Sequence, residues 1–243
     1  MVMPKFRYLI IIVFAVDLSG LAGCQTAREN SNIELLRNDR EAREKKEIAW
    51  IKKQGLVQAT PEEITVAQAG EVGFAGTKAS LPDHSLSVVF KIGSIIPVRG
   101  VGVSNLLTTT SFYELKNTRT GKSLAKTAST IGNGVLDQTG YKQKVLTSNN
   151  GTRLLIHETW CGGDGAHDTY ALVSKIADHD VWEVKYLKLP EFTGFDGIPE
   201  HGPIPVGFSG DDLIFDPLCS GRIFKKKLTE IEEVKNPLPF TVG

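Results

Sequence analysis

The residues best suited to chemistry lie in a short glycine-rich stretch near the middle of the chain. Residues 162–168 read Gly-Gly-Asp-Gly-Ala-His-Asp and connect two segments with the composition of β-strands. Aspartates that alternate with glycines can fold their carboxylates around a hard cation such as calcium. Asp164 and Asp168 are therefore the candidate metal ligands, and His167 and Asp168 are the candidate catalytic residues of a hydrolase.

The same composition also suits a turn with a purely structural role, because Gly and Asp are the residues that shape hairpin connections. The stretch lacks the twelve-residue ligand spacing of an EF-hand loop, and no glutamate stands at the required offset. We therefore expect a structural turn that holds no metal and no cofactor. Calcium binding and catalysis are the alternatives.

His157 and Glu158 precede this stretch on a predicted strand. Adjacent strand residues point to opposite faces, so these two side chains cannot act on the same substrate atom. His157 shares its face with Leu155 and Cys161, which favours a half-buried histidine with satisfied hydrogen bonds over a catalytic base. The chain contains no Gly-x-Ser-x-Gly elbow, His-Glu-x-x-His motif, phosphate loop or dinucleotide fingerprint. These features favour a protein that is not an enzyme.

Residues 190–212 are rich in Gly and Pro, and we expect them to form a long ordered loop. Phe192 and Phe195 stand there among glycines and acidic residues, and together they could form a recognition surface for a protein or a glycan. The alternative is that both rings fold back and cover a sheet edge, because long loops usually pack on themselves.

The elements that must position these residues are mainly strands. Alternating or β-rich segments occur at residues 85–92, 112–116, 122–124, 144–147, 152–156, 169–176, 181–189, 213–215 and 222–228. Asn150-Gly151 lies between two of them and is a strong hairpin signal. Short strands joined by turns, without alternating helices, predict an antiparallel sandwich or barrel, with a propeller as the less favoured option. Lys225-Lys226-Lys227 is expected to mark an exposed strand edge, and residues 230–234 a final helical turn.

The segment before these strands has a helical composition. Residues 33–53 contain no Gly or Pro and carry acid–base neighbours four residues apart, such as Arg43 and Glu47. Thr60, followed by a proline and by Glu63, has the pattern of a helix N-cap with a capping box. The sequence thus predicts a helical stalk over residues 34–70 and a β domain over residues 71–243.

The first residues have the pattern of an export leader. Lys5 and Arg7 precede the apolar run 9–16, which is too short to span a bilayer, and Leu21-Ala22-Gly23-Cys24 follows. These last four residues resemble the lipobox of bacterial lipoproteins. The resemblance implies removal of residues 1–23, lipidation (palmitate) of Cys24, and a flexible tether over residues 24–33. Since Gln25 rather than aspartate follows the cysteine, it also implies an outer-membrane protein that faces the periplasm.

That compartment sets the expectations for charge, cysteines and function. The chain has 28 basic and 28 acidic residues, and loss of Lys5, Arg7 and Asp17 with the leader leaves 26 and 27. Such a balance gives no general drive toward nucleic acid. Cys161 and Cys219 remain as a pair in a compartment where disulfides persist, and we expect them to be linked. Two free buried thiols and a reactive pair are the alternatives. The predicted function is a non-enzymatic envelope lipoprotein that binds an envelope protein or glycan, or supports an assembly. The alternative is a secreted hydrolase or a calcium-binding module.

Overall fold

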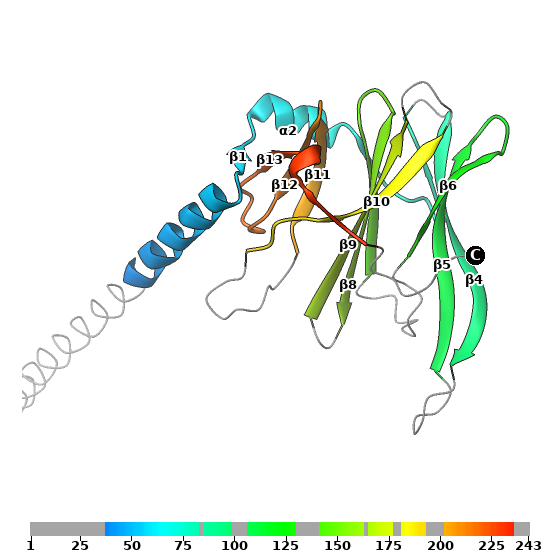
Figure 1. The fold of residues 1–243 in the computed structure, drawn as a ribbon, viewed down its shortest axis with the longest axis horizontal. Helices are drawn as coiled ribbons and strands as arrows, with labels where there is room; N and C mark the ends of the chain where they lie inside the picture. Colours follow the sequence, from blue (N-terminus) through cyan, green and yellow to red (C-terminus); the bar gives the residue numbers. More distant parts are fainter. Residues whose placement is uncertain are drawn as a thin grey trace, which may run out of the picture. The chain divides into compact units, whose positions relative to one another are not determined.

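The computed structural model describes residues 37–82, 85–98, 106–129, 141–162, 165–176, 181–192 and 202–235 (Figure 1). The chain divides into two compact units between residues 52 and 53. A helix runs over residues 37–53, and its exposed surface carries the ion pairs Arg37–Glu41 (3.3 Å) and Arg43–Glu47 (3.0 Å). The predicted helix is present there, while its role as a stalk stays a prediction. Within the described part of the chain, no helix combines the length and apolarity needed to span a bilayer.

The second unit is mainly β, as predicted. In chain order its elements are β1 (Val57–Gln58), α2 (Pro61–Gln68), β2 (Glu71–Val72), β3 (Lys78–Ser80), β4 (Leu86–Val98), β5 (Leu106–Asn117), β6 (Ser123–Ala128), β7 (Tyr141–Thr147), β8 (Arg153–Gly162), β9 (Gly165–Lys175), β10 (Trp182–Lys188), β11 (Ile204–Ser209), β12 (Asp212–Asp216), β13 (Phe224–Lys227), the 3-10 turn η2 (Leu228–Glu230) and β14 (Glu232–Val234). They form antiparallel sheets in the orders β3-β4-β5-β6, β14-β10-β9-β8-β7-β2 and β1-β13-β12-β11.

The main core lies between the β3–β6 sheet and the six-stranded sheet. Val88 and Leu115 from the first sheet belong to the same buried cluster as Leu154, Ile156 and Val173 from the second. A cavity of about 10 Å³ lies in this core. It is no larger than the space of roughly 10–15 Å³ that a single water molecule needs, so the core is closely packed. Two sheets that share a close-packed apolar core have the arrangement of a sandwich, which agrees with the predicted fold class.

The six-stranded sheet is also covered on its other face. Leu155 and Leu172 alternate with the core residues Leu154 and Val173, and all four side chains are buried. On this second face, the Arg153 guanidinium donates to the carbonyl of Gly210 (3.1 Å). The sequence here reads as continuous apolar runs because strands buried on both faces need no polar side.

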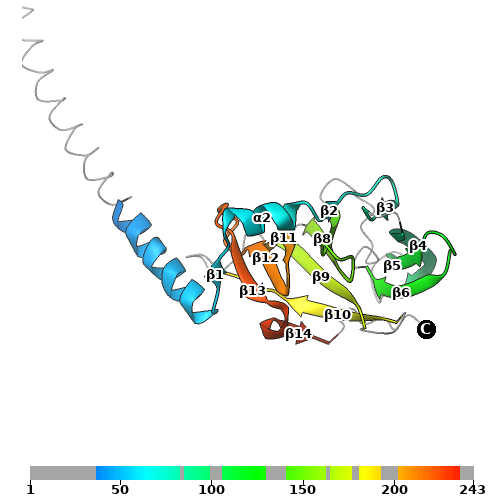
Figure 2. The ribbon, with the colours of Figure 1, turned by 90° about the horizontal axis from the view of Figure 1, so that it is seen from above.

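Helix α2 packs on the β1-β13-β12-β11 sheet, which we call the third sheet. The helix therefore belongs to the β domain and not to a stalk. Thr60 and Glu63 form the predicted capping box. Helix α2 lies beside β11 and β12 (Figure 2). Ala67 is fully buried, and a Cβ on Gly207 would lie 2.2 Å from the Ala67 carbonyl oxygen. Strand β1 pairs with β13. Residues 53–70 are therefore built into the β unit, and the helical segment predicted over 34–70 is divided.

The structure corrects three local predictions. Residues 190–212 are not a single loop, because β11 occupies Ile204–Ser209. The predicted final helical turn is instead η2 followed by strand β14. The glycine-rich turn is narrower than expected, because β8 extends to Gly162 and β9 begins at Gly165. Asp168 thus lies within a strand, not within a turn.

Candidate functional site

The β8–β9 hairpin places four polar and aromatic residues side by side on one face of the six-stranded sheet. Thr159 pairs with Asp168 in the strand register, and His157 pairs with Tyr170. Because side chains alternate along a strand, these four project to the same side. Glu158 projects to the opposite side, where its carboxylate accepts a hydrogen bond from the Tyr113 hydroxyl (2.5 Å). The predicted separation of His157 from Glu158 is confirmed.

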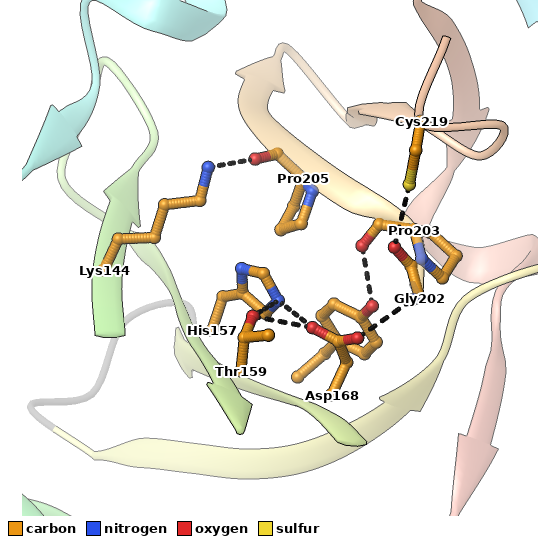
Figure 3. A network of polar contacts seen from close by, with 9 residues as sticks. Lys144, His157, Thr159, Asp168, Gly202, Pro203, Pro205 and Cys219 are labelled. Carbon is orange, nitrogen blue, oxygen red and sulfur yellow. Dashed lines mark hydrogen bonds and ion pairs between the residues drawn. The ribbon is translucent and has the colours of Figure 1, made fainter. Parts of the chain in front are cut away.

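Asp168 is the centre of the network (Figure 3). Its Oδ1 lies 2.7 Å from His157 Nε2 and accepts a hydrogen bond from the Thr159 hydroxyl (2.7 Å). Its Oδ2 accepts from the backbone N–H of Gly202 (3.0 Å). Burial raises the pKa of Asp168, but the hydrogen bonds from His157 and Thr159 outweigh burial and lower the pKa below its usual value. The carboxylate is therefore an anion whose two oxygens are both engaged.

Tyr170 completes the aromatic part of the network. Its ring stacks on the His157 imidazole with 4.9 Å between the centroids and 12° between the planes. Its hydroxyl donates to the carbonyl oxygen of Pro203 (2.6 Å). Burial raises the pKa of Tyr170 well above its ordinary value, so the hydroxyl keeps its proton and remains a donor.

Lys144 lies on the neighbouring strand β7, opposite His157, and adds a third contact to residues 202–205. Its ammonium donates to the Pro205 carbonyl (2.6 Å) and lies 3.7 Å from a carboxylate oxygen of Glu71. Burial lowers the pKa of Lys144. Asp168, Tyr170 and Lys144 together hold residues 202–205, which we call the strap, against the sheet.

Gly202 permits the close contact between strap and sheet. A Cβ at this position would lie 2.3 Å from Asp168 Oδ2 and 2.9 Å from the Tyr170 hydroxyl oxygen. The carboxylate occupies the space that a side chain would fill. The strap therefore packs directly on the side chains of Asp168 and Tyr170.

Cys219 contacts the strap from the far side. It lies in the exposed turn after β12 with a φ of 50°, and the backbone N–H groups of Leu218 (3.0 Å) and Gly221 (2.6 Å) donate to the Asp216 carboxylate there. Its thiol donates to the Gly202 carbonyl (3.5 Å). Cys161 lies two residues beyond Thr159 on β8, and its side chain is outside the described part of the structure. The Cys161–Cys219 disulfide stays a prediction.

The network resembles only in part the base-and-orienter arrangement of a hydrolase. A hydrolytic site needs an accessible nucleophile within hydrogen-bond reach of the base. The Thr159 hydroxyl lies 3.0 Å from His157 Nε2, but it donates its proton to the Asp168 carboxylate at 2.7 Å. The Cys219 thiol donates to a backbone carbonyl. The His157 side chain is 7% exposed, and the Asp168 side chain is 5% exposed. His157 is more deeply buried than predicted, and its Nε2 interacts with Asp168 and Thr159.

The other predicted site residues are placed only in part. Asp164, Phe195 and the His167 side chain lie outside the described residues, and Phe192 is half-buried just after β10. Among the described residues, no three His, Cys, Asp or Glu side chains gather as metal ligands would. Sequence reasoning identified Asp168 as a candidate site residue. It did not identify the strap or the contacts of Tyr170 and Lys144 with it, because no local sequence pattern links these residues.

Comparisons of this chain with protein-family models, with curated proteins and with solved structures found no match. No relative therefore supplies roles for His157, Asp168 or Tyr170, and their roles follow from their contacts.

Proposed function

We propose that this chain is a lipid-anchored protein of a bacterial cell envelope whose β domain binds an envelope component or supports an envelope assembly. The proposed anchor is a lipid on Cys24 after removal of residues 1–23. By its resemblance to sorted lipoproteins, the mature protein is proposed to sit in the outer membrane and to face the periplasm. The helix over residues 37–53 would then be the stalk between the lipid and the β domain.

The observation that supports a non-catalytic role is that the side chains of His157 and Asp168 are buried and already hydrogen-bonded within the protein. Both carboxylate oxygens of Asp168 accept protein hydrogen bonds, and the His157 and Asp168 side chains are both buried. A general base must instead reach a substrate proton directly or through one water. The network stabilises the domain by fixing residues 202–205, and such a scaffold presents its outer surfaces to a partner.

The anchor is tested by labelling the protein with a palmitate analogue in a Gram-negative host and by separating the two membranes. Wild-type protein should carry the label and fractionate with the outer membrane. Cys24→Ala should carry no label and should keep its leader. Wild-type protein without label would refute the lipoprotein assignment.

The binding role is tested by crosslinking in intact cells. The wild-type protein should yield a discrete adduct with one envelope component, and Asp168→Asn protein that remains folded should yield the same adduct. An enzyme with Asp168 at its centre would instead turn over a substrate, and Asp168→Asn would abolish that turnover. Detection of such Asp168-dependent turnover would refute the non-catalytic role.

A further inference from the structure

The outer face of the β3–β6 sheet carries an unusual concentration of lysine. Tyr113 and Leu115 point into the core, so the alternate β5 residues Phe112, Glu114 and Lys116 point outward. The strand register places Lys91 opposite Phe112 and Lys126 opposite Glu114. Lys78 pairs with Val89, which in turn pairs with Glu114, so Lys78 belongs to the same outer face.

The charge of the chain segment that forms this sheet is strongly one-sided. Among the described residues from 78 to 129, six side chains are basic and one is acidic, whereas the whole chain has 28 of each. The basic residues are Lys78, Lys91, Lys116, Arg119, Lys122 and Lys126, and the acidic residue is Glu114. The sheet therefore carries a local positive excess on a chain with no net charge.

Glu114 offsets only one of these charges. Its carboxylate lies 2.6 Å from the Lys91 ammonium and 3.3 Å from the Lys116 ammonium, and its side chain is 7% exposed. Burial raises the pKa of Glu114, but hydrogen bonds from Lys91, Ser123 and Lys116 outweigh burial and bring the pKa to about 2. Glu114 is thus fully charged at neutral pH, and the positive excess of the face remains.

Two of the lysines place their ammonium groups over the ring of Phe112. The Lys91 and Lys126 ammonium groups lie 5.9 Å and 5.6 Å from its ring centroid. The two lysines come from β4 and β6, the strands on either side of β5, and neighbouring strands are about 4.8 Å apart. The Lys91 side chain is 42% exposed, and Lys78 and Lys126 are exposed. The ammonium groups thus form a row across the strands that a partner in solvent can reach.

We infer that the outer face of the β3–β6 sheet, centred on Lys78, Lys91, Phe112 and Lys126, binds an acidic polysaccharide. A polyanion with a charge on successive sugars can meet several ammonium groups of the row at once, and its binding releases counterions. This inference deepens the proposed function, and it rests on that function for the compartment, where charged glycans rather than nucleic acids are available.

A lipid bilayer fits this face less well than a glycan. Interfacial binding to a membrane depends on apolar area that is inserted between the lipids, in addition to charge. The exposed large apolar side chains among the described residues lie on other elements, and they are Ile48, Val57, Val66, Ile176, Val181 and Ile204. Among the described residues of the lysine face, the larger apolar side chains are Val89 and Phe112, both half-buried, and the Lys91 and Lys126 ammonium groups lie over the Phe112 ring.

The experiment measures the binding of full-length lipidated protein in neutral detergent to a fluorescent alginate oligomer at several salt concentrations. A dextran oligomer of the same length is the neutral probe, and phosphatidylglycerol vesicles are the membrane probe. The test variant is Lys78→Gln/Lys126→Gln, which keeps the ion pairs of Glu114 with Lys91 and Lys116. The matched control is Lys188→Gln/Lys227→Gln, which removes two exposed lysines from the other two sheets. Thermal unfolding curves should be the same for all three proteins.

We expect wild type to bind alginate, with an affinity that falls as salt rises, and to bind dextran at least about tenfold more weakly. The test variant should bind alginate about tenfold or more weakly than wild type, and its log–log salt slope should fall by about 2. The control variant should match wild type. Absence of alginate binding, equal binding of dextran, an unchanged test variant, or tighter binding to vesicles than to alginate would overturn the inference. Palmitate labelling is independent, so a labelled protein that fails to bind alginate leaves the envelope proposal standing.

Discussion

Replacing Asp168 with alanine tests the role assigned to the buried network. The substitution removes the acceptor for His157, Thr159 and the Gly202 backbone N–H at once. Hydrogen bonds to charged groups contribute about 1.5–3 kcal/mol each, and breaking one side of a buried charged pair costs about 3–5 kcal/mol. Because contributions within one network are not additive, we expect a loss of about 3–5 kcal/mol in unfolding free energy. For a domain of this size the melting temperature should fall by about 6–20 °C.

A matched control separates this effect from the loss of a carboxylate in general. Asp211 pairs with Arg153 at 2.7 Å, but its side chain is 82% exposed. Exposed ion pairs contribute about 0–1 kcal/mol, so Asp211→Ala should change stability by no more than that. Chemical denaturation of both variants gives the comparison. A loss below about 1 kcal/mol for Asp168→Ala would refute a stabilising role for the network.

The pH dependence of the Asp168 effect has a definite sign. The folded-state pKa of Asp168 is lower than its usual value of about 3.9. Its ionised form therefore contributes stability that is fully present above the unfolded-state pKa and is lost as pH falls through the folded-state pKa. The stability difference between wild type and Asp168→Ala should stay constant from about pH 5 upward and shrink below about pH 4. A difference that grows on acidification would contradict this assignment.

Three further predictions follow from the same region. Gly202→Ala should destabilise the domain by about 1–3 kcal/mol because its Cβ would lie 2.3 Å from Asp168 Oδ2, whereas Gly73→Ala, which meets nothing within 4 Å, should change stability by less than about 0.5 kcal/mol. Chelator should leave the thermal unfolding curve unchanged because both Asp168 oxygens are engaged, and a fall that only calcium reverses would restore the metal hypothesis. Non-reducing peptide mapping of envelope-purified protein should show Cys161 linked to Cys219, a bridge that closes a loop of about 58 residues and contributes about 4 kcal/mol in the chain-entropy model. Two free thiols would contradict the bridge.

The hairpins could be predicted from sequence because their signals are local. Gly151 has a φ of 66°, a conformation that favours glycine. The side-chain oxygen of Asn150 accepts hydrogen bonds from the Ser148 hydroxyl (2.7 Å) and the Thr152 backbone N–H (3.2 Å). All the groups that make this turn lie within a few residues of each other. Strands β7 and β8 therefore pair as the Asn-Gly signal predicts.

The strap could not be predicted because its contacts join distant parts of the chain. Gly202 is 34 residues from Asp168, and Pro205 is 61 residues from Lys144. Glycines and prolines over residues 190–212 indicate a loop, and that composition hides the β11 strand within it. Only the tertiary structure shows that the strap binds Asp168, Tyr170 and Lys144. The sequence-based expectation that His157 is partly buried rested on its apolar neighbours alone.

The position of a strand in its sheet determines what the lysines on that strand can contact, as Lys225 and Lys226 on β13 show. The run Lys225-Lys226-Lys227 predicts an exposed strand edge, and this prediction is wrong because β13 lies between β1 and β12. The Lys225 ammonium binds the Glu63 carboxylate at the start of α2, and the Lys226 ammonium binds the Gln54 carbonyl (2.8 Å). These two lysines fasten the N-terminal elements of the β domain to the third sheet.

Lys78 and Lys126, unlike Lys225 and Lys226, lie on edge strands. They stand on β3 and β6, the two edge strands of their sheet, and both side chains are exposed. A charged side chain on an edge strand can protect that strand from unwanted pairing with another chain. Protection of edges does not explain the lysines in the middle of the sheet. Lys91 and Lys116 lie on the central strands β4 and β5, where no edge exists to protect. A row that continues across the centre of the sheet is better explained by an anionic partner laid over it than by protection of its edges.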